Sequence, residues 1–406
     1  MILLSSVSAR ADDWPEFRGP TGEGIARADN LPIEWSTQRN VAWKQTIPGG
    51  GWSSPVVRKG RIYLTTSVPV EGGVLGSQSL RALCLDARTG QVEWNIEIFH
   101  QEGGPKATIH NKNSHASPTP VIDDKRLYVH FGPQGTACLD LDGKVIWRNQ
   151  ELRYDAVHGN GGSPILIAEG LVFSADGSDR QFLVLLDRDT GKVVWKTDRR
   201  GNASRKFSFS TPLLIDVHGR RQIISPGSGF VASYDPRTGE EIWRVRYDGY
   251  SVIPRPVFGH GLVYVCTGYG PPTLMAIRPD GSGDVTETHV AWTLKKGLGL
   301  TPSPLLDGDE LYVVADNGIA TCVDARDGTV HWHERLPGGY SASPILAGGR
   351  IYFQNEEGLG IVLQAGKLFK ELARNDLGER SLASYAVADG ALFIRTKEHL
   401  YRIQKP

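Results

Sequence analysis

The sequence of 406 residues has only 2 methionines and no excess of either charge, because 45 Lys and Arg balance 45 Asp and Glu. A chain without a basic excess lacks the electrostatic attraction that nucleic acids and anionic membranes exert. Beyond the first residues it also has no apolar run long enough to span a bilayer. We therefore expect neither a nucleic-acid partner nor a transmembrane span.

Cysteine is scarce, and its spacing excludes several classes of site. The four residues Cys84, Cys138, Cys266 and Cys322 form no CxxC, no CxxCH and no adjacent pair. Zinc, thioredoxin-like and c-type haem sites are therefore not indicated, and we expect buried free thiols. The sequence also lacks a GxSxG elbow, a Walker GxxxxGK[ST] loop and an HExxH motif, so we assign no catalytic residue and no metal ligand.

The N-terminal eleven residues are apolar and small, and they end in an A-x-A pattern at Ala9 to Ala11. This pattern is typical of the end of an export signal, although no basic region precedes it, which leaves open that the signal is only apparent. We expect residues 1–11 to be a signal remnant, 12–39 a lead-in segment and 40–406 a single propeller domain. The predicted location is the periplasm or cell envelope, and the predicted state is monomeric.

Glycine (48), proline (24) and tryptophan (10) are abundant, and much of this composition comes from a repeat. The repeat is an apolar residue, Asp, two residues, Thr or Asp, Gly, three residues and Trp, as in residues 85–94 (LDARTGQVEW), 186–195, 234–243 and 323–332. Residues 139–147 are one residue shorter, and 277–292 carry a longer turn. Asp can accept backbone N–H bonds within the turn and Gly supplies a positive φ, so each copy predicts a β-hairpin.

A second pattern alternates with the first. It is a small hydroxylated residue, Pro, two or three apolar residues, a polar turn and an apolar strand, usually with Tyr or Phe. Eight copies lie between Ser54 and Phe393, of which one begins with Arg255 and the last has Tyr385 in place of Pro. Two hairpins make one four-stranded antiparallel blade, so the sequence predicts an all-β, eight-bladed β-propeller. The last blade lacks a fourth strand, which we expect residues 40–47 to supply, and in the seventh blade Phe369 replaces the tryptophan.

Tryptophans that recur on an outer strand are expected to pack between blades and to be structural. They are Trp43, Trp94, Trp147, Trp195, Trp243, Trp292 and Trp332.

The Asp-x-x-Thr-Gly-x-x-x-Trp unit resembles the tryptophan-docking repeat of the PQQ-like (pyrroloquinoline-quinone) propeller superfamily. This superfamily includes quinoprotein alcohol dehydrogenases and BamB-like assembly proteins. Residues 14–20 (WPEFRGP), 48–55, 110–118 and 158–162 resemble more closely exported bacterial single-propeller proteins of the BamB-like type. A fold resemblance says little about activity.

The resemblance implies, for a quinoprotein dehydrogenase, a quinone below a disulfide of adjacent cysteines, a calcium ion held by carboxylates and amides, and an aspartate base. No two cysteines of this chain are adjacent, and Cys84, Cys138 and Cys322 share one repeated strand position. We therefore expect no cofactor, with PQQ and calcium as the alternative.

In a propeller, the connections between blades and those between the second and third strands open on one face, which we call the funnel face. We predict that a ligand or partner binds there. The candidate residues are Trp52, His110, Lys112, His115, His158, Asn160, Asp176, Asp179, Arg180, Tyr250, Arg255, Tyr269, Asp316, Asn317 and Tyr340. Mixed charges with aromatics suit a polar ligand or a peptide, and a merely solvated rim is the alternative.

Arg255 and three histidines among these candidates allow more than one interpretation. Arg255 stands where the other seven blades have Ser or Thr, so it could plug the channel, bind a carboxylate or bridge neighbouring blades. His110, His115 and His158 could meet at one rim as a metal site, or be ordinary polar loop residues.

The leading hypothesis is a non-catalytic exported scaffold that binds another protein of the cell envelope. The alternatives are a PQQ- and calcium-dependent dehydrogenase of alcohols or sugars, and a glycan-binding module that stacks sugars on its aromatic residues.

Overall fold

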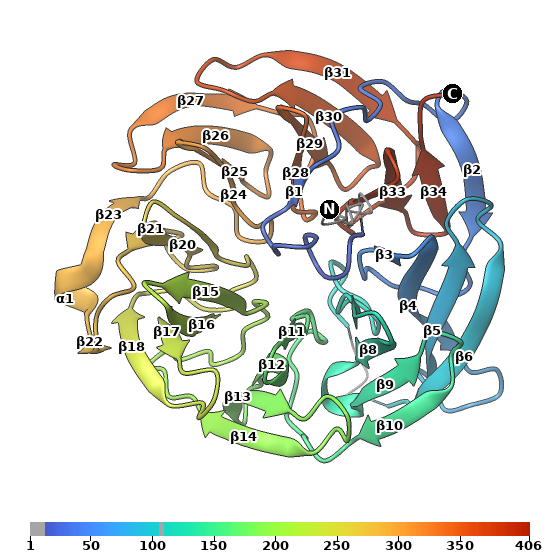
Figure 1. Cartoon of the computed structure of the whole chain (residues 1–406), viewed down its shortest axis with the longest axis horizontal. Coiled ribbons are helices and arrows are strands. Elements are labelled where there is room, and N and C mark those ends of the chain that lie inside the picture. Colours follow the sequence, from blue (N-terminus) through green and yellow to red (C-terminus); the bar gives the residue numbers. More distant parts are fainter. Residues whose placement is uncertain (1–12, 105–108) are drawn as a thin grey trace, which may run out of the picture.

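The computed structural model describes residues 13–104 and 109–406, and these form eight β-sheets arranged as blades around a central axis (Figure 1). The predicted signal remnant lies outside the described residues. Within each blade the four neighbouring strands are antiparallel, and the first of them in the repeat lies nearest the axis. The predicted eight-bladed, all-β propeller is confirmed.

The first four blades follow the order of the sequence. Blade 1 contains β3 (Val56–Arg58), β4 (Arg61–Pro69), β5 (Gln78–Asp86) and β6 (Val92–Gln101). Blade 2 contains β7 (Val121–Ile122), β8 (Arg126–His130), β9 (Thr136–Asp140) and β10 (Val145–Asn149), with the short 3-10 helix η2 (Gly132–Gln134) between β8 and β9. Blade 3 contains β11 (Ile165–Ile167), β12 (Gly170–Asp176), β13 (Gln181–Leu186) and β14 (Val193–Asp198). Blade 4 contains β15 (Leu213–Val217), β16 (Arg220–Gly227), β17 (Phe230–Tyr234) and β18 (Glu241–Arg246).

The other four blades complete the ring. Blade 5 contains β19 (Val257–Gly259), β20 (Leu262–Cys266), β21 (Leu274–Ile277) and β23 (Val290–Leu294), preceded by the short helix α1 (Thr286–His289). Blade 6 contains β24 (Leu305–Asp307), β25 (Glu310–Val314), β26 (Ile319–Asp324) and β27 (Val330–Arg335). Blade 7 contains β28 (Ile345–Ala347), β29 (Arg350–Gln354), β30 (Leu359–Gln364) and β31 (Glu371–Asp376). Blade 8 contains β32 (Ala386–Ala388), β33 (Ala391–Arg395) and β34 (His399–Ile403).

Blade 8 is completed by β2 (Val41–Thr46), which pairs antiparallel with β34 from Val41 opposite Ile403 to Thr46 opposite His399. The predicted closure of the ring by the segment near Trp43 is therefore confirmed. Two further short strands add parallel edges: β1 (Ile25–Ala26) to β28, and β22 (Gly283–Asp284) to β18.

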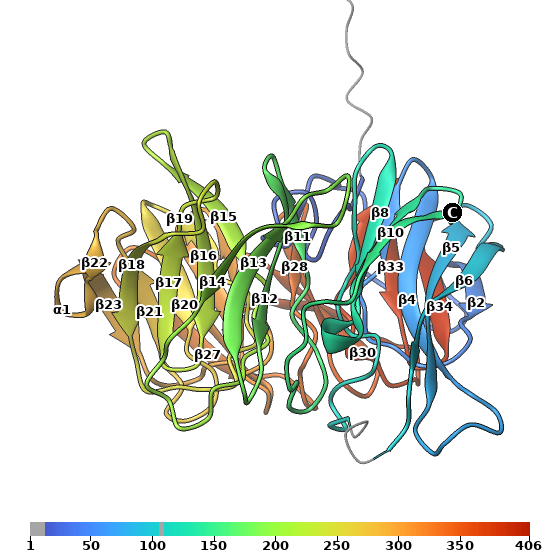
Figure 2. The same cartoon turned by 90° about the horizontal axis from the view of Figure 1, so that it is seen from below.

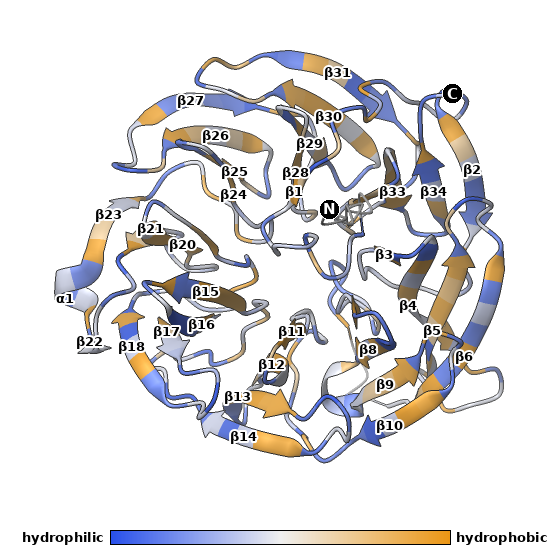
Figure 3. Ribbon diagram, viewed as in Figure 1, coloured by the Kyte–Doolittle hydropathy of each residue, from blue (hydrophilic) through white to orange (hydrophobic). Residues whose placement is uncertain are grey.

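The core of the molecule lies within and between the blades. Middle strands such as β5 and β13 are mostly hydrophobic, whereas outer strands such as β2 and β31 show hydrophilic and hydrophobic bands (Figure 3). All four cysteines are buried and free. Cys84, Cys138 and Cys322 each lie opposite a tyrosine on one side and a tryptophan on the other, which confirms their equivalent positions in the repeat.

The repeat turn explains how one blade contacts the next. In the turn of blade 1, Asp86 accepts hydrogen bonds from the N–H and the hydroxyl of Thr89, at 2.6 and 2.8 Å. Gly90 has φ of +76°, and a Cβ there would lie 2.8 Å from the indole of Trp43. The indole N–H of Trp43 donates to the carbonyl of Ala87 in the same turn, at 3.1 Å. The glycine is therefore required both for the backbone conformation and for contact with the tryptophan of the neighbouring blade.

The same indole-to-carbonyl bond recurs around the ring, with one exception. Five more tryptophans donate to the next turn, at Leu141, Arg188, Pro236, Ala325 and Gly366. Trp243 instead donates to Gln222 of its own blade, and Gln222 donates to the carbonyl of Pro279 in the longer turn of blade 5. The Gln222 amide thus bridges the wider gap that the longer turn leaves.

The sequence-based assignment of Phe369 as the missing tryptophan of blade 7 is wrong. The strand register places Ala373, not Phe369, opposite Val362, where the other blades have tryptophan. The space is filled instead by Trp35 of the lead-in, which stacks on Tyr352 with ring centroids 6.3 Å apart. Equivalent pairs, such as Tyr63 with Trp94, occur within other blades. The lead-in therefore supplies the aromatic residue that β31 lacks.

The lead-in crosses the centre of the ring on the face that carries the turns between the first and second strands, as the dark blue segment in Figures 1 and 2 shows. Trp14 is fully buried and pairs with Val57, and Pro15 accepts a hydrogen bond from Ile122. Further along, Glu23 accepts a bond from the N–H of Phe258. The lead-in thus closes one end of the central channel, and the funnel face lies at the other end.

Among the described residues, no helix is long and apolar enough to cross a membrane.

Candidate binding site

A pocket of about 270 Å³ lies on the propeller axis and opens at the funnel face. Most of its walls come from the connections that lead from the outer strand of one blade to the inner strand of the next. Its lining residues are Phe17, Trp52, Ser54, His110, Lys112, Asn113, Ser117, Thr119, His158, Gly161, Ser163, Arg205, Phe207, Phe209, Thr211, Tyr250, Ser251, Ile253, Tyr269, Thr301, Ser303, Ser341, Ser343, Leu382 and Ser384. Phe17 belongs to the lead-in, so the pocket is blind on that side.

The structure brings part of the predicted set together at this pocket. The candidates that line it are Trp52, His110, Lys112, His158, Tyr250 and Tyr269. The candidates that do not line it are His115, Asn160, Asp176, Asp179, Arg180, Arg255, Asp316, Asn317 and Tyr340.

Asp176 and Tyr340, two of the candidates outside the pocket, are buried and have structural roles, as has Arg255, described below. The carboxylate of Asp176 forms an ion pair of 2.9 Å with Arg199, and the side chains of both are almost inaccessible. Arg199 also donates to the carbonyl of Ser225, so this pair joins blades 3 and 4. Tyr340 is fully buried and donates to the carbonyl of Pro337, so it offers no surface on which a sugar could stack.

Five others form hydrogen bonds with residues close to them. Their hydrogen bonds are His115 to Gln101 at 3.1 Å, Tyr154 to Asn160 at 3.1 Å, Asp155 N–H to Asp179 at 2.7 Å, Arg180 to Asp179 at 3.2 Å and Ile319 N–H to Asn317 at 3.3 Å. Of the three histidines considered for a metal, only His110 and His158 lie side by side, with ring centroids 5.3 Å apart. Burial lowers the pKa of His158, and the neighbouring His110 lowers it further.

Lys112 crosses the mouth of the pocket from the connection between blades 1 and 2. Its ammonium group lies 2.8 Å from Glu356 and 3.4 Å from Asp316, on blades 7 and 6. Burial lowers the pKa of Lys112, but the two carboxylates outweigh burial, so the pKa lies above its ordinary value. Asp316 also accepts hydrogen bonds from the N–H groups of Leu300 and Thr301. Both carboxylates near the mouth therefore already have partners.

Two aromatic residues of the walls, Tyr250 and Trp52, each contact an arginine. The guanidinium of Arg205 lies 4.9 Å from the ring centroid of Tyr250 and donates to its hydroxyl at 3.1 Å. The guanidinium of Arg380 lies 6.0 Å from the ring centroid of Trp52. Such stacking holds a guanidinium in place while part of its hydrogen-bonding edge stays free.

The wall residues that the sequence analysis missed include three phenylalanines. Phe207 and Phe209 alternate with serines directly before Thr211, and this alternation before an inner strand is a signal that could have found them. Phe17 could not be found this way, because it reaches the pocket only through the long-range path of the lead-in.

Arg255 is buried and binds the lead-in. It forms an ion pair of 2.9 Å with Glu16 and donates to the carbonyls of Phe17 at 2.7 Å and Pro212 at 3.1 Å. Burial raises the pKa of Glu16, against the opposing effect of Arg255. The interpretation of Arg255 as a plug that holds a carboxylate agrees with this geometry, but the carboxylate belongs to the same chain.

A ring of hydrogen bonds runs around the axis at the inner end of the pocket. The first residue of the second repeat pattern donates its backbone N–H to the side-chain hydroxyl of its counterpart in the next blade. The donor and acceptor pairs are Ser54 to Thr119, Thr119 to Ser163, Ser163 to Thr211, Arg255 to Ser303, Ser303 to Ser343, Ser343 to Ser384 and Ser384 to Ser54, at 2.9 to 3.2 Å. The link from Thr211 to the next blade is missing because Arg255 has no hydroxyl.

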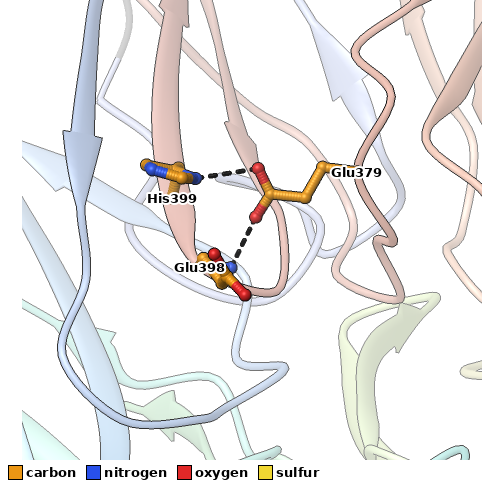
Figure 4. A group of neighbouring side chains, drawn as sticks. All are labelled: Glu379, Glu398 and His399. Carbon is orange, nitrogen blue, oxygen red and sulfur yellow. Dashed lines mark hydrogen bonds and ion pairs between the residues drawn. The ribbon is translucent and has the colours of Figure 1, made fainter.

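Another group, Glu379, Glu398 and His399, brings three possible metal ligands within 4.8 Å of one another (Figure 4). Glu379 accepts hydrogen bonds from the N–H of Glu398 at 2.6 Å and pairs with the His399 ring at 2.8 Å. Burial raises the pKa of Glu379, but these hydrogen bonds outweigh it and lower the pKa overall. The group is thereby explained as a contact that joins a hairpin of blade 8 to the preceding connection.

The pocket does not match the donor set that the quinoprotein resemblance implies. Among the described residues that line it there is no aspartate, glutamate or cysteine. A calcium ion in proteins is bound chiefly by carboxylate and carbonyl oxygens, and the carboxylates beside the pocket are already paired, Asp316 and Glu356 with Lys112 and Glu16 with Arg255. The residues present therefore do not fit a calcium-bound quinone.

This geometry defines a class of protein, an eight-bladed propeller with a blind axial pocket, and comparison with known proteins gives the family. The family model described as outer membrane protein assembly factor BamB, a PQQ-type repeat model, matches residues 33–150, 81–291 and 281–400. Together these matches cover most of the sequence, so the chain belongs to this family.

The curated relatives fall into two groups. BamB of Yersinia pestis is 27% identical over 176 residues, which is 40% of this chain and 42% of that protein. Methanol dehydrogenase subunit 1 of Methylobacterium organophilum is 28% identical over 155 residues, covering 32% and 23% of the two chains. The dehydrogenase subunit of the quinone alcohol dehydrogenase of Komagataeibacter europaeus is 24% identical over 325 residues, covering 70% and 39%. The chain thus matches less than half the length of each of these relatives.

Solved structures show the same fold. BamB of Moraxella catarrhalis aligns with a TM-score of 0.64 at 13% identity, over 90% of this chain and 97% of that one. Quinohemoprotein alcohol dehydrogenase of Comamonas testosteroni aligns with a TM-score of 0.66 at 12% identity, over 99% and 82%. Scaffold and dehydrogenase relatives are therefore similarly close.

Proposed function

We propose that this chain is a non-catalytic β-propeller of the cell envelope that binds a partner polypeptide at its funnel face. The observation that carries the proposal is the composition of the axial pocket. Its walls are aromatic, cationic and hydroxylated, and its described lining residues include no carboxylate or thiol. Such walls suit recognition of a polar chain and offer neither the calcium ligands nor the base of a quinoprotein.

The wall pair of Arg205 and Tyr250 is the most suitable contact for a partner. Arg205 is exposed and Tyr250 half-buried, and Tyr250 lies 6.2 Å from Tyr269 and 6.4 Å from Phe207 between ring centroids. Aromatic and arginine side chains dominate the binding energy of many protein interfaces. A polypeptide that docks on the funnel would bury this cluster.

The proposal is tested by site-specific photo-crosslinking in the native envelope. A photoreactive residue at Lys206, an exposed neighbour of Arg205, should capture a discrete partner, and the double variant R205A/Y250A should reduce that capture at least tenfold. The matched control is Leu368→Ala, because Leu368 is 84% exposed on a turn of blade 7 away from the pocket lining, and this variant should leave capture unchanged. Equal capture by R205A/Y250A and the wild type would contradict the proposal.

The second candidate function is a quinone-dependent dehydrogenase. It is favoured by the dehydrogenase relatives and by the structural match over 99% of this chain. Adding PQQ and Ca²⁺ to the purified protein separates the two functions, because a dehydrogenase would show a Ca²⁺-dependent absorbance change and reduce a dye with alcohols or sugars. We expect no dye reduction.

A further inference from the structure

The ring of hydroxyl groups at the inner end of the axial pocket has a property that its structural role does not use. Each hydroxyl oxygen accepts a backbone N–H from the neighbouring blade, which leaves the hydroxyl proton to be donated elsewhere. Only Ser343 uses its proton within the ring, donating to Ser303 at 3.1 Å. Among the described residues, no hydrogen bond is donated by the hydroxyls of Ser54, Thr119, Ser163, Thr211, Ser303 or Ser384.

These donors converge on one place. All seven hydroxylated residues line the same pocket, and each is only 2% to 5% exposed. The inner strands that follow them surround the axis of the ring (Figure 1). Several buried donors that face one cavity from different blades can be satisfied together by a single group with several acceptor lone pairs.

The free hydroxyl protons of the ring favour an acceptor such as an anion, and the groups behind the ring do not favour a cation. On the lead-in side lie the buried guanidinium groups of Arg255 and Arg18, together with the carboxylate of Glu16, which pairs with Arg255, and that of Glu23, whose charge acts on Arg18. Arg18 donates to the carbonyl of Glu23, while its Nε and Nη1 atoms have no partner among the described residues. The two carboxylates balance the two guanidinium groups, so this end carries no net charge that would attract a cation, and oxygens that already accept N–H groups are poor cation ligands.

The body of the occupant is set by the rest of the pocket. Phe17, Phe207, Phe209, Ile253 and Leu382 provide apolar walls. The volume of about 270 Å³ is at the small end of ligand pockets, which span roughly 300 to 1,000 Å³. Because the pocket is blind at Phe17, a polypeptide could enter only by an end or by a side chain.

We propose that the hydroxyl ring binds the carboxylate of a monocarboxylic acid with an apolar or aromatic body. Its two oxygens accept hydrogen bonds from the ring while the apolar part packs between the phenylalanines. The acid is either a small molecule or the C-terminal residue of a polypeptide, and for the polypeptide source the inference rests on the proposed function.

Calorimetric titration of the purified chain tests the proposal. The probes are 3-phenylpropionate and N-acetyl-phenylalanine, each paired with its neutral amide. Charge-assisted hydrogen bonds are about twice as strong as neutral ones, so the acids should bind at least tenfold more tightly than the amides. Equal affinity of acid and amide, or no binding of either acid, would overturn the proposal.

Variants of the ring give the matched control. Thr119→Val and Thr211→Val remove a hydroxyl and keep the side-chain shape, whereas Thr119→Ser and Thr211→Ser keep the hydroxyl. The valine double variant should lose at least tenfold in acid affinity, and the serine double variant should retain binding. Unfolding curves of both variants identify any that does not fold, and unchanged affinity in a folded valine variant would overturn the proposal.

A peptide ending in phenylalanine distinguishes the two sources. Competition by the free-acid peptide and not by its C-terminal amide indicates a polypeptide end, whereas binding of the small acids alone indicates a small-molecule ligand. If neither acid binds, while crosslinking at the funnel face still captures a partner, only the carboxylate site is refuted. If the R205A/Y250A variant captures the partner as well as the wild type does, while the acids still bind, only the proposed partner function is refuted.

Discussion

The replacement of a blade residue by Trp35 of the lead-in leads to a quantitative prediction. Trp35 is 3% exposed and packs against Tyr352 and, edge to face, Tyr385, with ring centroids 6.3 and 6.5 Å apart. A buried tryptophan removes about 150 to 250 Å² from water, or roughly 4 to 7 kcal/mol at 25 to 30 cal/mol per Å², as an upper bound. Trp35→Ala should therefore lower the free energy of unfolding by about 3 to 5 kcal/mol.

The measurement is guanidinium unfolding followed by far-UV circular dichroism, with Phe369→Ala as the comparison. Phe369 is only half-buried and contacts Trp332 at 5.3 Å between ring centroids, so its truncation should cost less, about 1 to 2 kcal/mol. A greater loss of stability in Phe369→Ala than in Trp35→Ala would refute the assignment of Trp35 to the interface of blades 7 and 8.

Three other predictions concern buried polar groups. Arg255→Met leaves Glu16 buried without its partner and should cost about 3 to 5 kcal/mol in denaturant unfolding, whereas the double variant with Glu16→Gln should recover part of that loss. Gln222→Leu removes the bridge from Trp243 and should cost about 2 to 3 kcal/mol, measured as a shift in unfolding midpoint at unchanged slope. Burial lowers the pKa of His130 to about 3, so below pH 6.5 the folded state binds fewer protons than the unfolded state. The free energy of unfolding should therefore fall by about 1.4 kcal/mol per pH unit as the pH drops from 6.5 towards 3. Unfolding curves of His130→Gln, measured over the same pH range, should lack this contribution.

The sequence predicts the propeller well because the signals of each blade are local. The Asp, Thr and Gly of a turn such as Asp86 to Gly90 lie within five residues, and their hydrogen bonds form inside the same hairpin. The missing fourth strand of blade 8 can be inferred by counting, which is why the closure by β2 (Val41–Thr46) is found as well.

The lead-in and the buried part of the candidate site could not be predicted in this way. Trp35 contacts Tyr352, and Glu16 contacts Arg255, across more than two hundred residues with no repeat to indicate the pairing. Asp176 is the last residue of β12 and lies next to a connection on the funnel face, but whether its side chain faces the pocket or an internal arginine depends on packing that turn chemistry does not encode.

The closure of the ring has a consequence for how the molecule is made. Val41 pairs with Ile403, so a strand synthesised early waits for almost the whole chain before its partner exists. Contacts of such long sequence separation require large loops to close and slow the folding of a chain. Until β34 (His399–Ile403) is available, β2 has an unpaired edge that can pair with other chains. Keeping nascent molecules apart should therefore raise the yield of closed propellers more than stabilising any single blade.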